Sequence, residues 1–153
     1  MKKRSFFLVV ICFALVAAGC SKSAGTKLYL IPEGYVGWVH IIYDQSKQPE
    51  IKKDEGTSIF PIGKDGILKV SNKDAVYGTS INKYFYVDAK GNKVREIDYL
   101  EEIHNQNVGN AQIGEGNQVV KTLPTVESFF VGDKSLMKND EDVYPEDEME
   151  QTK

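Results

Sequence analysis

The sequence contains few of the residues that cross-link a fold or carry out catalysis. Its 153 residues include two cysteines, Cys12 and Cys20, and two histidines, His40 and His104. Both cysteines fall within the first 20 residues, so the rest of the chain has no thiol that could form a disulfide or act as a nucleophile. A domain built from that remainder has to be stabilised by its hydrophobic core alone.

Long hydrophobic runs are also scarce. The longest one extends from Phe6 to Val16, after the basic residues Lys2, Lys3 and Arg4. It is about half the roughly 20 residues that a helix needs to cross a bilayer. A basic start followed by a short apolar run is typical of a signal peptide rather than of a membrane-spanning helix.

The residues after this run, Ala17-Ala18-Gly19-Cys20, resemble the bacterial lipobox. In that motif, signal peptidase cuts before the cysteine, whose sulfur carries a diacylglyceryl group; Ala17 stands where the motif favours leucine. The resemblance implies that residues 1–19 are a lipoprotein signal peptide and that Cys20 anchors the protein to the extracytoplasmic face of the cell membrane. The alternative is an ordinary secretory signal, or an uncleaved anchor, in which Cys20 has no role.

A strong basic charge is absent, which argues against nucleic acid as a partner. Residues 1–19 carry three basic residues and no acidic one, so their removal changes the formal net charge from −3 to −6. Residues 138–153 alone contain seven acids and two lysines and few apolar residues, which predicts a disordered acidic tail. We expect residues 20–26 to be a polar tether and residues 27–137 to form a single domain.

The densest run of β-branched and aromatic residues extends from Leu30 to Tyr43 and includes the single tryptophan, Trp38. Both alternating faces of this run are mostly apolar, which predicts a central strand covered on each side. Further strands are expected at residues 27–31, 57–60, 67–70, 83–87, 93–97, 118–122 and 127–131. The pattern of about seven short strands, with no long amphipathic helix, predicts an all-β fold with one transthyretin-like or immunoglobulin-like β-sandwich.

The connections between these strands have their own signals. Asp65-Gly66 predicts a hairpin turn, and residues 88–92 a five-residue hairpin loop with Gly91 in a left-handed conformation. Apolar residues spaced three apart from Ile97 to Ile103 permit a short helical turn. Residues 44–56 are expected to form a connection with at most a weak edge strand, and the glycine-rich residues 105–117 a long exposed loop.

Two resemblances to known families bear on the fold. Residues 37–70 resemble the transthyretin-like and carboxypeptidase-regulatory sandwiches of extracellular bacterial proteins. The phrase Ile-Pro-Glu-Gly-Tyr-Val-Gly-Trp-Val, with Tyr-Phe-Tyr-Val-Asp and Phe-Phe-Val-Gly further on, resembles a family of uncharacterised Gram-positive lipoproteins. This second and more specific likeness covers about residues 30–132, and it implies no known activity.

Motifs for catalysis or metal binding are missing. Mononuclear zinc sites usually take three protein ligands, whereas His40 and His104 stand alone; His40 shares a strand face with apolar residues, and His104 follows a cluster of acids. There is no Gly-x-Ser-x-Gly elbow, and Gly109-Asn-Ala-Gln-Ile-Gly114 lacks the lysine of a phosphate loop. The acidic tail lacks the alternating carboxylates of a calcium loop. We therefore expect no enzyme, no cofactor and no metal.

Aromatic residues provide the remaining functional signal. Tyr84 and Tyr86 point to one face of their strand and Phe85 to the other, so a buried Phe85 would leave the tyrosines as an exposed surface for a carbohydrate or protein ligand. The alternative is ordinary cross-strand packing. The sequence thus predicts a membrane-anchored lipoprotein whose sandwich is a non-catalytic binding or envelope-associated module. Two alternatives remain: an accessory or inhibitory subunit of a membrane or envelope complex, and a metal-dependent hydrolase that uses both histidines.

Overall fold

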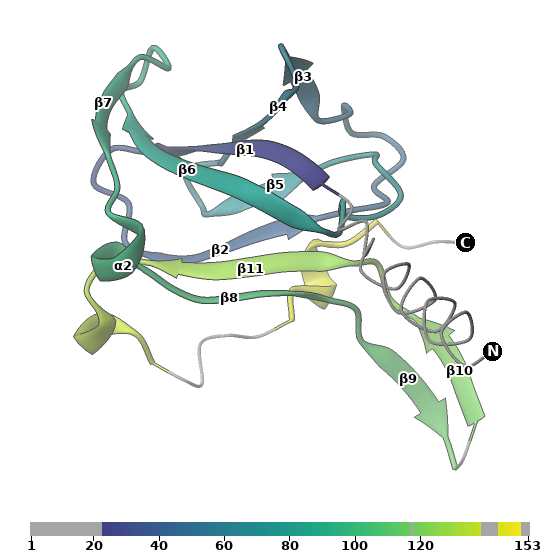
Figure 1. Cartoon of the computed structure of the whole chain (residues 1–153). Helices are drawn as coiled ribbons and strands as arrows, with labels where there is room; N and C mark the ends of the chain where they lie inside the picture. The colour runs from purple at the N-terminus through teal and green to yellow at the C-terminus, as the bar shows by residue number, and fades with distance from the viewer. Residues whose placement is uncertain (1–22, 117, 139–143, 151–153) are drawn as a thin grey trace, which may run out of the picture.

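A computed structural model of the chain describes residues 23–116, 118–138 and 144–150. Two sheets pack face to face, and a two-stranded arm extends from them (Figure 1). The first sheet, sheet A, has the strand order β3-β4-β1-β6-β7. Its strands are β1 (Ser23–Pro32), β3 (Lys52–Asp54), β4 (Thr57–Pro61), β6 (Thr79–Val87) and β7 (Lys93–Glu96). The central strand β1 is parallel to both β4 and β6, whereas β3 and β7 are antiparallel edge strands.

Sheet B has the strand order β5-β2-β11-β8. Its strands are β2 (Gly37–Ile42), β5 (Ile67–Lys69), β8 (Ile103–Gly109) and β11 (Val126–Val131). Strand β2 lies between β5 and β11, and its residues from Trp38 to Ile42 are buried on both faces. The predicted central, doubly covered strand is therefore confirmed.

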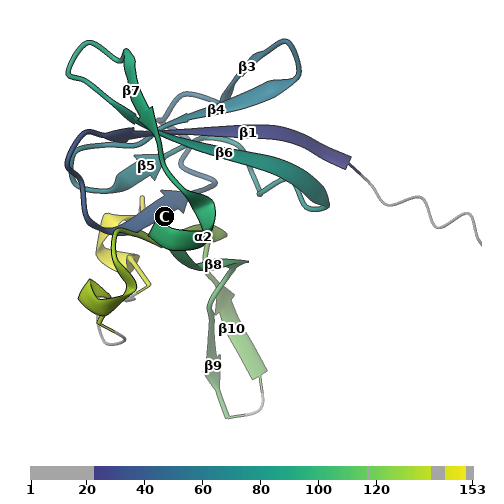
Figure 2. The same cartoon turned by 60° about the vertical axis from the view of Figure 1, so that its left-hand side comes forward.

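The arm consists of β9 (Gln112–Glu115) and β10 (Gln118–Thr122), which pair only with each other and project from the body in both views (Figures 1 and 2). The expectation of a long loop over residues 105–117 is wrong, because β8 and β9 occupy most of this segment. The polar residues of β8 form hydrogen bonds towards sheet A: the Gln106 Nε2 donates to the Tyr84 hydroxyl at 2.9 Å.

Three short helical turns complete the described elements: α2 (Tyr99–Glu102), η1 (Lys134–Leu136) and η2 (Glu146–Glu148). The helical turn expected between Ile97 and Ile103 is confirmed as α2. Asp98 caps its N-terminus, because the Asp98 carboxylate accepts from the backbone N–H of Leu100. Among the described residues, no helix is long and apolar enough to span a membrane.

The core lies between the inner faces of the two sheets and is rich in aromatic rings. Tyr29 stacks on Tyr84 with ring centroids 4.6 Å apart and on Phe60 at 4.9 Å, and Phe129 of sheet B meets Tyr29 edge-on at 5.3 Å. Offset-stacked and edge-on pairs of this kind add stability beyond the area they bury. The all-β sandwich is confirmed, and the described part of the chain forms eleven strands in place of about seven.

The connections differ in part from expectation. The hairpin loop over residues 88–92 between β6 and β7 is confirmed, with Gly91 at φ +83°. The hairpin expected around Asp65-Gly66 is wrong, because β4 and β5 belong to different sheets and this turn carries the chain from sheet A to sheet B. Two adjacent strands joined by an Asp-Gly turn suggest a hairpin from the sequence, but Ile59 and Phe60 pair with β1 and Ile67 pairs with β2.

Both ends of the predicted domain extend further than expected. The tether predicted for residues 20–26 is wrong from residue 23 on, since β1 starts at Ser23 and Thr26 pairs with Thr57 of β4. The disordered tail predicted for residues 138–153 is wrong over residues 144–150, where Glu148 forms an ion pair with Lys69 at 2.8 Å. The signal peptide and Cys20 lie outside the described residues.

Candidate functional site

The parallel strands of sheet A all end at the same edge, and their C-terminal turns surround a cavity. Strand β1 is followed by Glu33–Val36, β4 by Ile62–Lys64, and β6 by Asp88–Gly91. Since parallel neighbours run in one direction, the turns that follow them must meet at one edge. The cavity measures about 830 Å³, which is within the range of small-molecule sites.

Main-chain hydrogen bonds fix the three turns to one another. Glu33 donates its backbone N–H to the carbonyl of Val87 at 2.9 Å, and Ile62 donates to the carbonyl of Leu30 at 2.9 Å. The Tyr86 hydroxyl donates to the carbonyl of Tyr35, also at 2.9 Å. The cavity is therefore formed by turns that are already connected.

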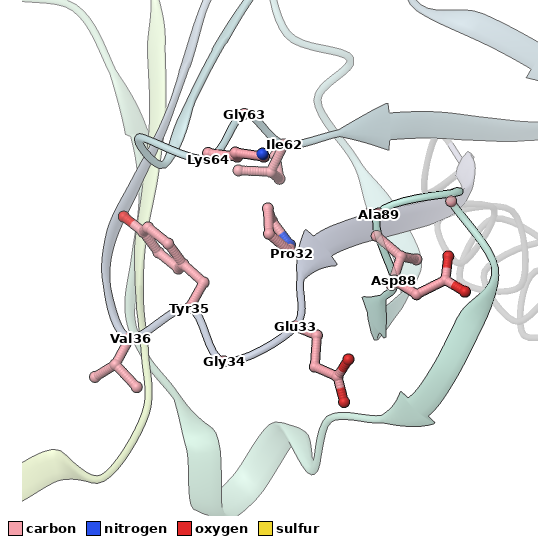
Figure 3. A pocket seen from close by; sticks show the side chains of 12 residues that line it. Pro32, Glu33, Gly34, Tyr35, Val36, Ile62, Gly63, Lys64, Asp88 and Ala89 are labelled. Atoms are coloured by element: carbon pink, nitrogen blue, oxygen red, sulfur yellow. The ribbon is translucent and has the colours of Figure 1, made fainter.

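Figure 3 shows the side chains around the cavity. Tyr35 and Val36 lie on one side, Ile62 and Lys64 on another, and Ala89 opposite Tyr35, with Pro32 between them. The Tyr35 hydroxyl donates to the carbonyl of Trp38. Burial, and to a lesser extent the nearby Asp65 carboxylate, raises the pKa of Tyr35, so this hydroxyl stays protonated and keeps its role as a donor.

Charged groups stand at the border of the cavity. Asp88 is committed to its own loop, since its carboxylate accepts from the backbone N–H groups of Lys90 and Asn92 and from the Asn92 side chain at 2.8–2.9 Å. These bonds, that of the Asn92 side chain first, lower the pKa of Asp88. Glu33 and Lys64 are exposed and provide one acceptor and one donor of opposite charge. The lining residues, all described, include no serine, cysteine or histidine.

The predicted tyrosine surface is not exposed. Tyr84 and Tyr86 are 1% and 5% exposed and face the core, while Phe85 is half-buried on the outer face with the Lys93 ammonium 4.4 Å from its ring centroid. The expected orientation of this strand is therefore wrong. Each tyrosine hydroxyl has a hydrogen-bond partner at the border of the core. The Tyr84 hydroxyl accepts from the Gln106 side chain, and the Tyr86 hydroxyl donates to the carbonyl of Tyr35. Because both hydroxyls are satisfied, both rings can be buried.

The two histidines are not brought together. His40 lies on β2 and His104 on β8, with β11 between them. The His40 Nδ1 is 3.0 Å from the Ser128 hydroxyl, and its ring stacks on Trp38. Within residues 23–116, 118–138 and 144–150, no three His, Cys, Asp or Glu side chains gather closely enough to hold a metal ion.

A buried ionic cluster, absent from the sequence predictions, lies between the sheets. Glu127 of β11 is fully buried and accepts from the Lys27 ammonium at 3.0 Å and from the hydroxyls of Tyr29 and Tyr43. Burial first, and the Glu127 charge second, raise the pKa values of both tyrosines. The only sequence signal was a glutamate on the same alternating face as Phe129 and Val131. Because the ammonium and the carboxylate are paired and almost inaccessible to solvent, we interpret the cluster as a structural link between β1 of sheet A and β11 of sheet B.

Comparison with known proteins identifies the family and the fold. A family model described as a family of unknown function (DUF6843) matches residues 23–150. Among solved structures, a protein of Bacillus anthracis described as a putative lipoprotein is similar, with a TM-score of 0.59 and 23% sequence identity. The alignment covers 82% of this chain and 84% of that one. No curated protein sequence matches the chain.

Proposed function

The chain belongs to the family of unknown function DUF6843, and we propose that it is a lipid-anchored extracytoplasmic protein whose β-sandwich is a non-catalytic binding module. The anchor is supported by the resemblance of Ala17–Cys20 to a lipobox and by the description of the Bacillus anthracis neighbour. Gram-positive lipoproteins were also the family that the sequence phrases resembled.

The observation that carries the binding role is the position of the cavity at the C-terminal end of β1, the end farther in the chain from Cys20. Strand β1 begins at Ser23, three residues after Cys20, and ends at Pro32 in the lining of the cavity. Its 10 residues extend about 30 Å at the usual rise of a strand. The cavity therefore lies at the end of the sandwich away from the anchor point, where it is accessible to ligands of the cell envelope.

The lining favours a ligand that combines an apolar surface with a few polar groups. Pro32, Val36 and Ile62 provide the apolar contacts, and Glu33 and Lys64 supply opposite charges at the border. Carbohydrates and peptides of the envelope have this mixed character. The ligand class we propose is therefore a carbohydrate or a short peptide segment of a protein.

The test is a titration of the full-length protein in detergent with soluble peptidoglycan fragments, which contain both chemistries, followed by calorimetry. We expect Lys64→Ala to weaken binding about tenfold, as the loss of one charge-assisted hydrogen bond does. Ala89→Trp should fill the cavity and abolish binding. Lys53→Ala, on edge strand β3, is the matched control and should bind as the wild type does. Equal loss in the Lys53 and Lys64 variants would place binding elsewhere.

A second candidate function, an accessory or inhibitory subunit of a membrane complex, is supported by the arm. Ile113, Val119 and Val120 are 44%, 58% and 62% exposed there, although an isolated hairpin gains little stability of its own. Exposed β-branched residues on a projecting hairpin fit contact with a partner protein. Replacing both valines by serine should remove a co-purifying membrane protein without changing the ligand titration above.

A further inference from the structure

The end of the molecule opposite the cavity holds the C-terminal segment from Tyr144 to Glu150. In both views this segment lies at sheet B and away from sheet A (Figures 1 and 2). It contains four acidic residues and no basic one. Three of its contacts with the body involve polar side chains: the Tyr144 hydroxyl donates to the carbonyl of Pro124, Glu148 pairs with Lys69, and Glu150 meets the turn after β2.

The contact of Glu150 is the most specific of the three. Its backbone N–H donates to the Gln45 Oε1 at 2.7 Å, while its carboxylate accepts from the Ser46 hydroxyl at 2.9 Å and from the backbone N–H of Lys47 at 3.1 Å. Three consecutive residues of the body thus recognise both the main chain and the side chain of one glutamate. We call these three residues, with Lys69, the tail site.

Gln45 shows that the tail site is built rather than incidental. Its side chain is fully buried, and the Nε2 donates to the carbonyl of Tyr43 at 2.8 Å, which directs the Oε1 towards the segment. Main-chain bonds from Gln45 to Val70 and from Asp44 to Asn72 hold the turn in place. A buried carbonyl oxygen without a partner is unfavourable, and the N–H of Glu150 supplies that partner while the segment covers Gln45.

The contacts that hold the segment are also weak enough to be exchanged. Ser46 and Lys47 are exposed, and the Lys69–Glu148 pair has side-chain exposures of 29% and 47%. Ion pairs in contact with solvent contribute little and are screened by salt. A cavity of about 950 Å³ borders Glu150 and leaves space for a longer chain; its charged lining consists of Lys47 and Lys73 together with Asp44 and Asp74.

We propose that the tail site is a docking site for an acidic peptide with two glutamates separated by one residue, and that the C-terminal segment is its internal competitor. The segment itself shows the chemistry that is recognised: a glutamate at the Gln45–Lys47 turn and another, two positions earlier, at Lys69. A partner protein with such a peptide displaces the segment and takes over its hydrogen bonds. This binding is independent of the cavity at the other end of the sandwich.

The test uses a fluorescent synthetic peptide with the sequence of residues 144–150 and measures its polarisation with the full-length protein in detergent. The double variant Glu148→Lys/Glu150→Lys should release the internal segment. If that segment occupies the site nine-tenths of the time, the variant binds the peptide about tenfold more tightly than the wild type. The same peptide with both glutamates replaced by glutamine should not bind.

Substitutions in the body keep the proposal falsifiable. Adding Lys69→Glu or Ser46→Ala to the double variant should weaken binding of the peptide, whereas Lys53→Glu on β3 should not; both site residues contact solvent, so these changes leave the fold intact. The emission of Trp38 checks folding in every sample. Absence of binding to the double variant, or equal binding by the Lys69→Glu protein, would overturn the proposal. A wild-type dimer that the double variant converts to a monomer would assign the segment to a second copy, and would overturn internal competition.

Discussion

Lys27 and Glu127, 100 positions apart in the chain, form a buried ion pair of 3.0 Å that joins the central strand of sheet A to β11 of sheet B. The carboxylate has three donors, because the hydroxyls of Tyr29 and Tyr43 add to the ammonium. A pair of this kind contributes little net stability compared with apolar residues of the same size, but removing one partner is severe.

The ion pair leads to a prediction on stability. Lys27→Met leaves the Glu127 carboxylate buried without a counter-charge and should lower the free energy of unfolding by about 3–5 kcal/mol. The double change Lys27→Met/Glu127→Gln should recover most of that loss, since no charge is left buried, the amide oxygen can accept from the Tyr29 hydroxyl and the amide N–H can donate to the Tyr43 hydroxyl oxygen. Urea unfolding followed by Trp38 emission measures both. Losses that simply add would show that the two residues do not interact.

The tyrosines of the cluster predict the response to alkali. Burial and Glu127 raise the folded-state pKa of Tyr43 above that of the unfolded chain, about 10. The resulting stability is fully present below pH 10 and is lost as the pH rises further, because the unfolded chain then releases a proton that the folded one retains. The free energy of unfolding should therefore fall less steeply above pH 10 in the Tyr43→Phe variant than in the wild type, by about 1.4 kcal/mol per pH unit. An unchanged slope would mean that Tyr43 ionises in the folded protein.

Reversal of the predicted face of β6 changes what mutations should do. Tyr84→Ala should cost about 3–5 kcal/mol, as loss of a large core aromatic does. Phe85→Ala should cost much less, because its ring is half-buried on the outer face. Thermal unfolding by circular dichroism compares the two. Greater sensitivity at Phe85 would contradict the observed orientation.

Gly66 and Gly91 offer a matched test of backbone strain. Both have positive φ, +82° and +83°, but a Cβ at Gly66 would lie 2.5 Å from the carbonyl oxygen of Trp38, whereas at Gly91 nothing lies within 4 Å. Gly91→Ala should lower the free energy of unfolding by about 1 kcal/mol, the usual cost of placing an alanine in the left-handed backbone conformation. Gly66→Ala adds a steric clash with Trp38 and with the Tyr35 ring, so its loss should be clearly larger. Equal losses would show that the turn before β5 moves freely.

The anchor is tested by labelling. Wild-type protein should incorporate palmitate and partition into detergent with the membrane, and Cys20→Ala should abolish labelling and leave an uncleaved precursor. Cys12→Ala is the control within the same segment and should label normally. Labelling that persists in the Cys20 variant would remove the basis for the proposed location.

Much of the fold follows from local sequence pattern, because alternation and turn residues act over short distances. The strand containing Trp38, the hairpin around Gly91 and the helical turn capped by Asp98 are all local and were predicted. The parallel pairing of β1 with β4 and β6 was not, since each pair brings together segments with other strands between them. The spacing of residues within one short segment therefore does not indicate which distant strand will pair with it.

The candidate sites were harder to predict for a related reason. Alternation shows that Tyr84 and Tyr86 share a face, but Phe85 is equally apolar, so the pattern does not indicate which face is buried. The burial of Glu127 could not be predicted because Lys27, its counter-charge, is 100 positions away in the sequence. The acidic composition of residues 138–153 predicts a disordered tail, but composition cannot reveal that Gln45 accepts a hydrogen bond from the backbone of Glu150.

The position of β11 between β2 and β8 has a kinetic consequence. Sheet B is incomplete until residues up to Val131 are available, and the centre of sheet A requires β6, which arrives some fifty residues after β1. Folding dominated by such non-local contacts is slow, typically on the millisecond-to-second scale. A chain that emerges N-terminus first therefore cannot complete sheet B until β11 is available, which is compatible with the export that we propose.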